Sequence, residues 1–180
     1  MSCYLRPRLA GASVFFTLAL AQRGTALLVE EIARLRWAVG VTLRDRPVRI
    51  DAMVVLPDHL HALWTLPDDD SDYGTRWRLI KTRFSSGLPK GPLRLSHARR
   101  HERGIWQRRF WEHHIRSAAD FEAHRAFCWT APVRQGLTER PEDWPFSSIH
   151  RDQARPPPAG DRRCVQARTL PVRNPSSAPR

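Results

Sequence analysis

The pattern of apolar positions along the 180 residues predicts a first set of β-strands. Strand-forming residues are concentrated in 13–20, 48–56 and 59–66, which we expect to be three core strands. Only Pro57 and Asp58 separate the second of these strands from the third. A connection this short joins strands that lie antiparallel and next to each other.

Apolar residues spaced three and four positions apart predict three helices, over about 25–44, 73–86 and 118–130. Ser117 is a suitable N-cap for the third helix, and Pro132 is expected to stop or bend it. The apolar residues that define the first two helices are Leu27, Leu28, Ile32, Leu35, Val39 and Leu43, then Trp77, Ile80 and Phe84.

A fourth strand is predicted over 105–115, where aromatic residues and arginines interleave. The element order is then β-α-β-β-α-β-α, which indicates an α+β, ferredoxin-like sandwich with a central antiparallel sheet and the strand 59–66 inside it. Residues 1–150 are expected to form this one domain. Residues 151–180 hold six prolines and seven arginines and predict a disordered tail, while 87–104 predict a mobile basic loop.

Two histidines open the strand 59–66. Because side chains on a strand alternate between faces, His59 and His61 are expected to project from the same face, with Leu60 buried behind them. Neutral imidazole is a common metal ligand, and such a pair leaves coordination positions open for another side chain and a substrate oxygen. The same pattern also occurs by chance on half-exposed strands.

The charge balance points to a polyanionic partner. The formal net charge is +12 and the sequence pI is about 11.3, and only Lys81 and Lys90 among the basic residues are lysines. Arginine contacts phosphate through a planar fork and stacks on bases, which favours nucleic acid over a membrane surface.

Positive charge is concentrated between residues 76 and 116, with twelve Lys and Arg against two acidic residues. Aromatic rings between arginines suit a surface that pairs phosphates and stacks unpaired bases, although each ring alone is equally suited to the core. The predicted DNA contacts are Arg76, Arg78, Lys81, Arg83, Arg103, Arg108, Arg109 and Trp106.

The three cysteines are far apart and have no metal-ligand spacing, so neither a disulfide framework nor a zinc knuckle is predicted. A reducing, cytoplasmic compartment is expected, with nucleoid association if DNA is the partner. Arg6 and Arg8 before an apolar stretch imitate a secretory signal, but the strand formers in 13–20 favour a core strand instead. No stretch has the length of a membrane span.

Several segments, in this order, resemble the REP-associated tyrosine transposases, a branch of the His-hydrophobic-His single-strand transposases. The resemblance covers about residues 4–150. It is carried by Phe15-Phe-Thr, Val54-Val-Leu-Pro-Asp-His-Leu-His-Ala-Leu-Trp-Thr-Leu-Pro, Thr75-Arg-Trp-Arg-Leu-Ile-Lys, Gly104-Ile-Trp-Gln-Arg-Arg-Phe-Trp-Glu-His, Pro132-Val-Arg-Gln-Gly-Leu and Trp144-Pro-Phe-Ser-Ser.

The resemblance implies a domain that recognises single-stranded or hairpin DNA and cuts one strand beside the hairpin. In such enzymes a helical tyrosine attacks a phosphodiester and forms a 5′-phosphotyrosine, while a divalent metal, Mg or Mn, polarises the phosphate. His59 and His61 match the pair that holds this metal.

The chain departs from the family pattern at two positions. The family helix reads Tyr-x-x-x-Asn-Pro-Val, whereas this chain has Phe127 in place of the nucleophile and Ala131 in place of the third metal ligand. Positions 127 and 131 are one helical turn apart and share a face. Tyr4 and Tyr73 are the only tyrosines, and neither is expected to replace the missing one. His124 is on much the same face and suits either a ligand or a structural role.

Two classes of function follow. The chain is either a metal-dependent DNA strand transferase that uses another nucleophile, or a protein that binds hairpin DNA without cleaving it. A third reading is an RNA binder on the same sheet topology, although the aromatic signature of such sheets is missing. We expect a cleavage-deficient DNA-binding member that holds its metal weakly, with monomer and homodimer both open.

Overall fold

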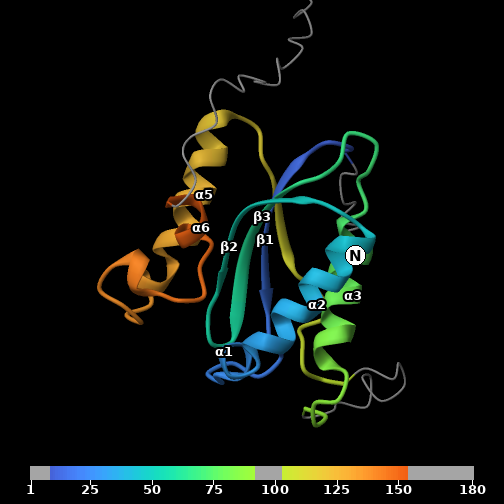
Figure 1. The fold of residues 1–180 in the computed structure, drawn as a ribbon, viewed down its shortest axis with the longest axis vertical. Helices are drawn as coiled ribbons and strands as arrows, with labels where there is room; N and C mark the ends of the chain where they lie inside the picture. The colour runs from blue at the N-terminus through green and yellow to red at the C-terminus, as the bar shows by residue number, and fades with distance from the viewer. Residues whose placement is uncertain (1–8, 92–102, 154–180) are drawn as a thin grey trace, which may run out of the picture.

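The computed structural model describes residues 9–91 and 103–153. Its four strands form one antiparallel sheet in the order β2-β3-β1-β4 (Figure 1). The strands are β1 (Ser13–Ala19), β2 (Arg49–Val55), β3 (His59–Thr65) and β4 (Trp111–His114). This order confirms the predicted α+β, ferredoxin-like architecture, and it places β3, the histidine strand, inside the sheet.

Helices cover both faces of the sheet. They are α1 (Leu27–Glu30), α2 (Ile32–Asp45), α3 (Tyr73–Ser85), α5 (Ala118–Arg134), the 3-10 turn η1 (Pro141–Asp143) and α6 (Ile149–Gln153). Figure 1 shows α2 and α3 on one side of the sheet and α5 on the other. In the part of the chain that is described, no helix combines the length and apolar character needed to cross a membrane.

The face under α2 and α3 carries the larger core. Phe16 of β1, Trp64 of β3 and Trp77 of α3 are fully buried there, and the two indole rings stack at 4.0 Å between centroids. Side chains of this size dominate core energetics, and truncating one to alanine typically costs about 3–5 kcal/mol.

The face under α5 carries a second core. It includes Phe15, Leu63, Cys128 and Ala131, which come from β1, β3 and α5. Because side chains alternate along β3, Leu60 lies in the first core and its two histidine neighbours face α5. The strand pattern therefore brings His59 and His61 beneath α5.

The predicted first helix is divided in two. Glu31 adopts φ −100° and ψ 28° and separates α1 from α2. Leu28 and Leu35 on either side of the break are both buried. The apolar stripe continues through the break, so periodicity alone predicted one helix.

The prediction that Pro132 stops or bends the helix near Thr130 placed its end too early, because α5 continues to Arg134 with Pro132 inside it. Proline lacks a backbone N–H, but in the last turn this costs the helix a single hydrogen bond. The amide of Gln135 then donates to the carbonyl of Ala131 and completes the end of the helix.

The predicted strand over 105–115 pairs with β1 at two separate places. Leu20 pairs with Trp106, and Thr17 pairs with Trp111, the first residue of β4. From Thr17 in β1 to Leu20 just after its end is three residues, whereas from Trp111 back to Trp106 is five, so the partner segment contains two extra residues. The excursion between the two pairings carries Arg108, which is exposed together with the residue after it, Arg109.

The segment 144–148 lies along the outer edge of β2. Phe146 accepts a hydrogen bond from the Val55 amide, and the Ser148 amide donates to the Met53 carbonyl. The Trp144 indole donates to the carbonyl of Val55 at 2.8 Å. The motif Trp144-Pro-Phe-Ser-Ser is therefore packed against the edge of the sheet. The middle of the predicted basic loop and nearly all of the predicted tail lie outside the described residues.

Candidate functional site

His59 and His61 lie side by side on β3, facing α5. Each is about 7% exposed, and their ring centroids are 5.1 Å apart with the planes nearly perpendicular. The expectation that they share one face is therefore met in the structure.

His59 is held by hydrogen bonds at both ring nitrogens. Its Nδ1 donates to Asp58 Oδ1 at 2.6 Å, and its Nε2 accepts from Gln135 Nε2 at 2.9 Å. Asp58 is in turn held by the Gly24 amide at 2.7 Å and by Arg23 at 3.1 Å. Burial alone would raise the pKa of Asp58, but these hydrogen bonds and the Arg23 charge outweigh it, so the pKa lies below its usual value. A carboxylate fixed in this way orients the His59 ring as it does in metal sites.

His61 is neutral at physiological pH. Burial, aided by the nearby His59 and by Arg134, lowers the pKa of His61 to about 3. Its Nδ1 lies 2.9 Å from the Thr17 hydroxyl, and its ring stacks on Phe15 at 5.6 Å. An imidazole that stays neutral and is fixed from two sides is suited to bind a metal ion.

Phe127 lies beside this pair. Its ring is 40% exposed and meets His61 edge to face at 5.1 Å. The Arg134 guanidinium covers the ring at 3.7 Å from its centroid. Ala131, one turn along α5, is buried in the apolar cluster that includes Phe15. Phe127 therefore places a hydrocarbon ring beside His61. A nucleophile at this position would need an oxygen atom.

The donor set around the pair fits a metal ion only in part. His59 and His61 supply two imidazoles, but Ala131 supplies no ligand atom. Within the described ranges, the pair belongs to no group of three His, Cys, Asp or Glu side chains with metal-ligating separations. Gln135 reaches His59 and carries an amide oxygen, so it is the polar group best placed to assist.

Other nucleophiles are poorly suited. Tyr73 is the first residue of α3 and is buried in the larger core, on the face of the sheet opposite to the histidine pair. Cys128 is fully buried on the α5 face, and burial raises the pKa of its thiol to about 12, so it stays protonated. Tyr4 lies outside the described residues.

Arg76, one of the predicted DNA contacts, is 1% exposed and is a structural residue. Its guanidinium donates to Asp70 at 2.7 Å. It also donates to the backbone carbonyls of Arg46, Pro47 and Asp72. Helical periodicity placed Arg76 on the polar face of α3, but the α2–β2 connection folds over that position. Arg76 is therefore removed from the candidate interface.

The other predicted contacts differ in availability. Arg78, Arg108 and Arg109 are exposed. Lys81 donates to the Gln107 carbonyl and Arg83 to Thr42, while Trp106 packs edge to face on Phe84. Arg103 donates to the carbonyl of Leu88. The α3 residues of this set are on the side of the sheet opposite to the histidine pair. Arg108 and Arg109 are closer to the pair along the sheet, because the amide of the preceding residue, Gln107, donates to Ala19, and Ala19 pairs with His59.

Sequence reasoning missed four residues that contact the pair or Phe127, directly or through a neighbour: Arg23, Asp58, Arg134 and Gln135. The sequence pattern places Asp58 only in the turn before β3. Arg134 and Gln135 were missed because the helix was expected to end before them. The sequence signal that could have identified Arg134 and Gln135 is the segment Pro132-Val-Arg-Gln-Gly-Leu, which is one of the segments that carry the family resemblance.

No family model matches the chain. Both the sequences of curated proteins and a solved structure are similar to it over most of its length. The chain is 41% identical over 155 residues to the "REP-associated tyrosine transposase" of Escherichia coli (strain K12), covering 86% of this chain and 87% of that protein. It is 40% identical over 154 residues to the "Putative REP-associated tyrosine transposase" of Haemophilus influenzae, covering 84% and 88%.

The fold is shared with a solved structure of a REP-associated tyrosine transposase bound to a REP hairpin. The TM-score is 0.75 at 42% identity, over 86% of this chain and 87% of that one.

A ferredoxin-like domain with a His-Leu-His pair under a covering helix defines the class of His-hydrophobic-His proteins. Within that class, the chain belongs to the REP-associated tyrosine transposase family, because identity above 40% extends over most of both chains.

Proposed function

We propose that this chain binds hairpin or single-stranded DNA and does not cleave it. Phe127 carries the second half of the proposal, because this ring lies against His61 and has no oxygen that could attack phosphorus. The site otherwise keeps the features that orient a DNA phosphate, including the neutral His61, the fixed His59 and nearby guanidinium groups.

The binding half rests on charge and exposure. Arg108 and Arg109 project from the excursion beside β1, and Arg23 and Arg134 flank the histidine pair. Guanidinium groups around a partly buried site pair well with a phosphodiester backbone. The solved relative is bound to a REP hairpin, which supports the same class of ligand here. A DNA ligand in turn favours a cytoplasmic, nucleoid-associated location.

A divalent ion, Mg or Mn, would be held by His59 and His61 and would polarise a bound phosphate. The missing ligand at Ala131 makes this binding weak. His59 is oriented by Asp58, and Gln135 occupies its Nε2, so a metal ion would have to displace that hydrogen bond.

The test combines retention with chemistry on one oligonucleotide. A labelled DNA hairpin with a single-stranded flank is incubated with the protein and manganese, and is then scored by fluorescence anisotropy and on a denaturing gel. We expect saturable binding that survives chelation, without a nick and without a covalent adduct. The matched control is an oligonucleotide of the same length and composition whose scrambled sequence cannot form the hairpin.

Two results would contradict the proposal. A nick or adduct formed by the unmodified protein would mean that another nucleophile is used. Equal or tighter binding of an RNA hairpin of the same sequence would favour the RNA-binding alternative.

A further inference from the structure

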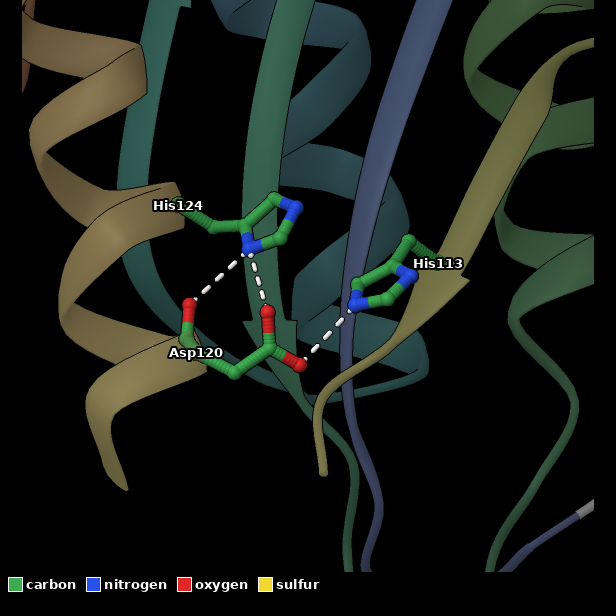
Figure 2. Close-up of side chains that lie close together, drawn as sticks. All are labelled: His113, Asp120 and His124. Carbon is green, nitrogen blue, oxygen red and sulfur yellow. Dashed lines mark hydrogen bonds and ion pairs between the residues drawn. The ribbon is translucent and has the colours of Figure 1, made fainter. Parts of the chain in front are cut away.

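A second cluster of ligating side chains lies on the α5 face, at a different place from the histidine pair. His113 Nε2 on β4 is 2.9 Å from Asp120 Oδ2, and His124 Nδ1 is 2.9 Å from Asp120 Oδ1. Figure 2 shows the Asp120 carboxylate between the two imidazole rings, with one oxygen directed at each. The rings stack at 4.6 Å with only 15° between their planes.

We propose that His113, Asp120 and His124 form a binding site for a divalent transition-metal ion, separate from the His59–His61 pair. One atom from each side chain lies within 4.8 Å of the other two. A tetrahedral ion with ligands at about 2.1 Å separates them from each other by about 3.4 Å, so small rotations of the three side chains suffice. Two imidazole nitrogens and one carboxylate oxygen suit zinc, cobalt, nickel or manganese better than magnesium.

The local structure fixes the three residues before any ion arrives. Ser117 caps α5 by accepting from the Asp120 amide at 3.1 Å, and Asp120 Oδ2 accepts from the Arg116 amide at 2.9 Å. His124 follows Asp120 by one helical turn. His113 is held from the strand side, where its ring lies parallel to Trp111 at 6.0 Å.

Access and charge also agree with an ion. The three side chains are about 21–25% exposed, so an ion can enter from solvent and keep a water ligand. Without an ion, His113 Nε2 is hydrogen-bonded to the Asp120 carboxylate, and His124 Nδ1 donates to the backbone carbonyl of Asp120 at 2.9 Å. Metal binding would replace both hydrogen bonds. The proposal therefore requires that a metal ion displace these two hydrogen bonds.

Phe15 separates this cluster from the first pair. Its ring stacks on His61 at 5.6 Å and contacts His124 at 4.8 Å. Because His113 comes from β4 and the other two ligands from α5, an ion here would join the short edge strand to the helix. Its expected effect is on folding stability, independently of whether the chain cleaves DNA.

The first experiment counts ions in the full chain without a polyhistidine tag. Cobalt is added to the wild type, Asp120→Asn, His124→Gln and His61→Gln, and binding is followed by visible absorption and equilibrium dialysis. We expect a bound cobalt ion that is lost in Asp120→Asn and His124→Gln and retained in His61→Gln. His150→Gln, which changes an exposed histidine elsewhere, is the matched control and should bind like the wild type.

Loss of binding only in His61→Gln, or equal binding in all variants, would overturn the assignment. Zinc should also raise the midpoint of thermal unfolding of the wild type by about 5 °C at a hundredfold excess over Kd, and not that of Asp120→Asn. Circular dichroism without metal shows whether each variant folds.

A second measurement needs no substitution in the cluster. Manganese is added to the wild type, and the imidazole proton resonances of its histidines are followed by NMR. The signals of His113 and His124 should broaden at lower metal concentration than that of His150. Broadening that begins at His59 and His61, with the other two unaffected, would contradict the proposal.

Discussion

In the proposed function, Phe127 and Ala131 account for the absence of cleavage, while the residues around them resemble a complete site. The histidine pair, its orienting Asp58 and the adjacent Arg134 are all in place, and Phe127 contacts both His61 and Arg134. Compared with the family pattern given above, position 127 lacks an oxygen and position 131 lacks a ligand atom. Both differences concern one site, so we expect their effects to be coupled.

Restoring both groups should therefore act cooperatively. Phe127→Tyr alone should give little nicking, because the phosphate is still poorly polarised. The double variant Phe127→Tyr/Ala131→Asn should form a covalent protein–DNA adduct at least ten times faster than either single variant, and only with manganese or magnesium. The adduct is measured on a denaturing protein gel with labelled hairpin DNA.

Adding His61→Ala to the double variant is the control and should abolish the adduct. Asparagine at the buried position 131 can cost about 1–3 kcal/mol of stability through overpacking, so unfolding is measured in parallel. A folded double variant that binds hairpin DNA and still forms no adduct would mean that more of the site has been lost.

His61 also makes the stability of the chain depend on pH. Its pKa is about 3 in the folded state, whereas an unfolded histidine has the ordinary value near 6.5. Between these values the unfolded state binds the extra proton, so stability is intact above pH 6.5 and falls as the pH decreases. The free energy of unfolding should fall by up to about 1.4 kcal/mol per pH unit between pH 6 and pH 4.5.

Urea unfolding at several pH values measures this slope. His61→Gln should make it flatter, while His150→Gln should leave it unchanged. If both variants keep the wild-type slope, His61 is protonated in the folded protein.

At the level of elements, the histidine strand was predictable because an i, i+2 pair on a strand must share a face. The hydrogen-bond partners of the pair were not predictable in this way. The Asp58 carboxylate is held by the backbone amide of Gly24, a residue 34 positions earlier whose φ is +75°. Gln135 follows a proline that was expected to end the helix, so its approach to His59 needed the observed course of α5.

Arg76 is a case in which helical periodicity gave the wrong environment. Replacing it with alanine should cost about 3–5 kcal/mol of stability, because Asp70 and three carbonyls lose a buried guanidinium. The folded fraction should still bind hairpin DNA with unchanged affinity. Arg78→Ala, on the exposed side of the same helix, should change stability by less than about 0.5 kcal/mol.

Urea denaturation and anisotropy on the two variants check this pair of outcomes. If Arg76→Ala were as stable as the wild type and bound DNA more weakly, the original assignment of Arg76 to the interface would be restored.

On the scale of the whole molecule, the net charge of +12 predicts DNA binding that weakens steeply with salt. Arg108→Ala/Arg109→Ala should weaken hairpin binding at every salt concentration. It should also reduce the slope of log K against log salt by about 1.4–1.8, the value for two lost phosphate contacts. Arg36→Ala/Arg44→Ala removes the same charge from exposed positions of α2 and is the matched control.

Anisotropy titrations from low to moderate salt measure both quantities. If both double variants reduced the slope of log K against log salt equally, binding would depend only on the total charge of the protein. The segment that carries Arg108 and Arg109 would then not be a defined interface.

The segment 144–148 has a consequence for self-association. It occupies hydrogen-bonding groups at Met53 and Val55, so β2 cannot readily accept a strand from a second copy at those positions. The opposite edge is β4, which has only four residues and pairs with no further strand among those described. A dimer that continued one sheet into another would therefore join through β4, the strand that carries His113. In such a dimer the His113–Asp120–His124 clusters of both copies would lie close to the interface.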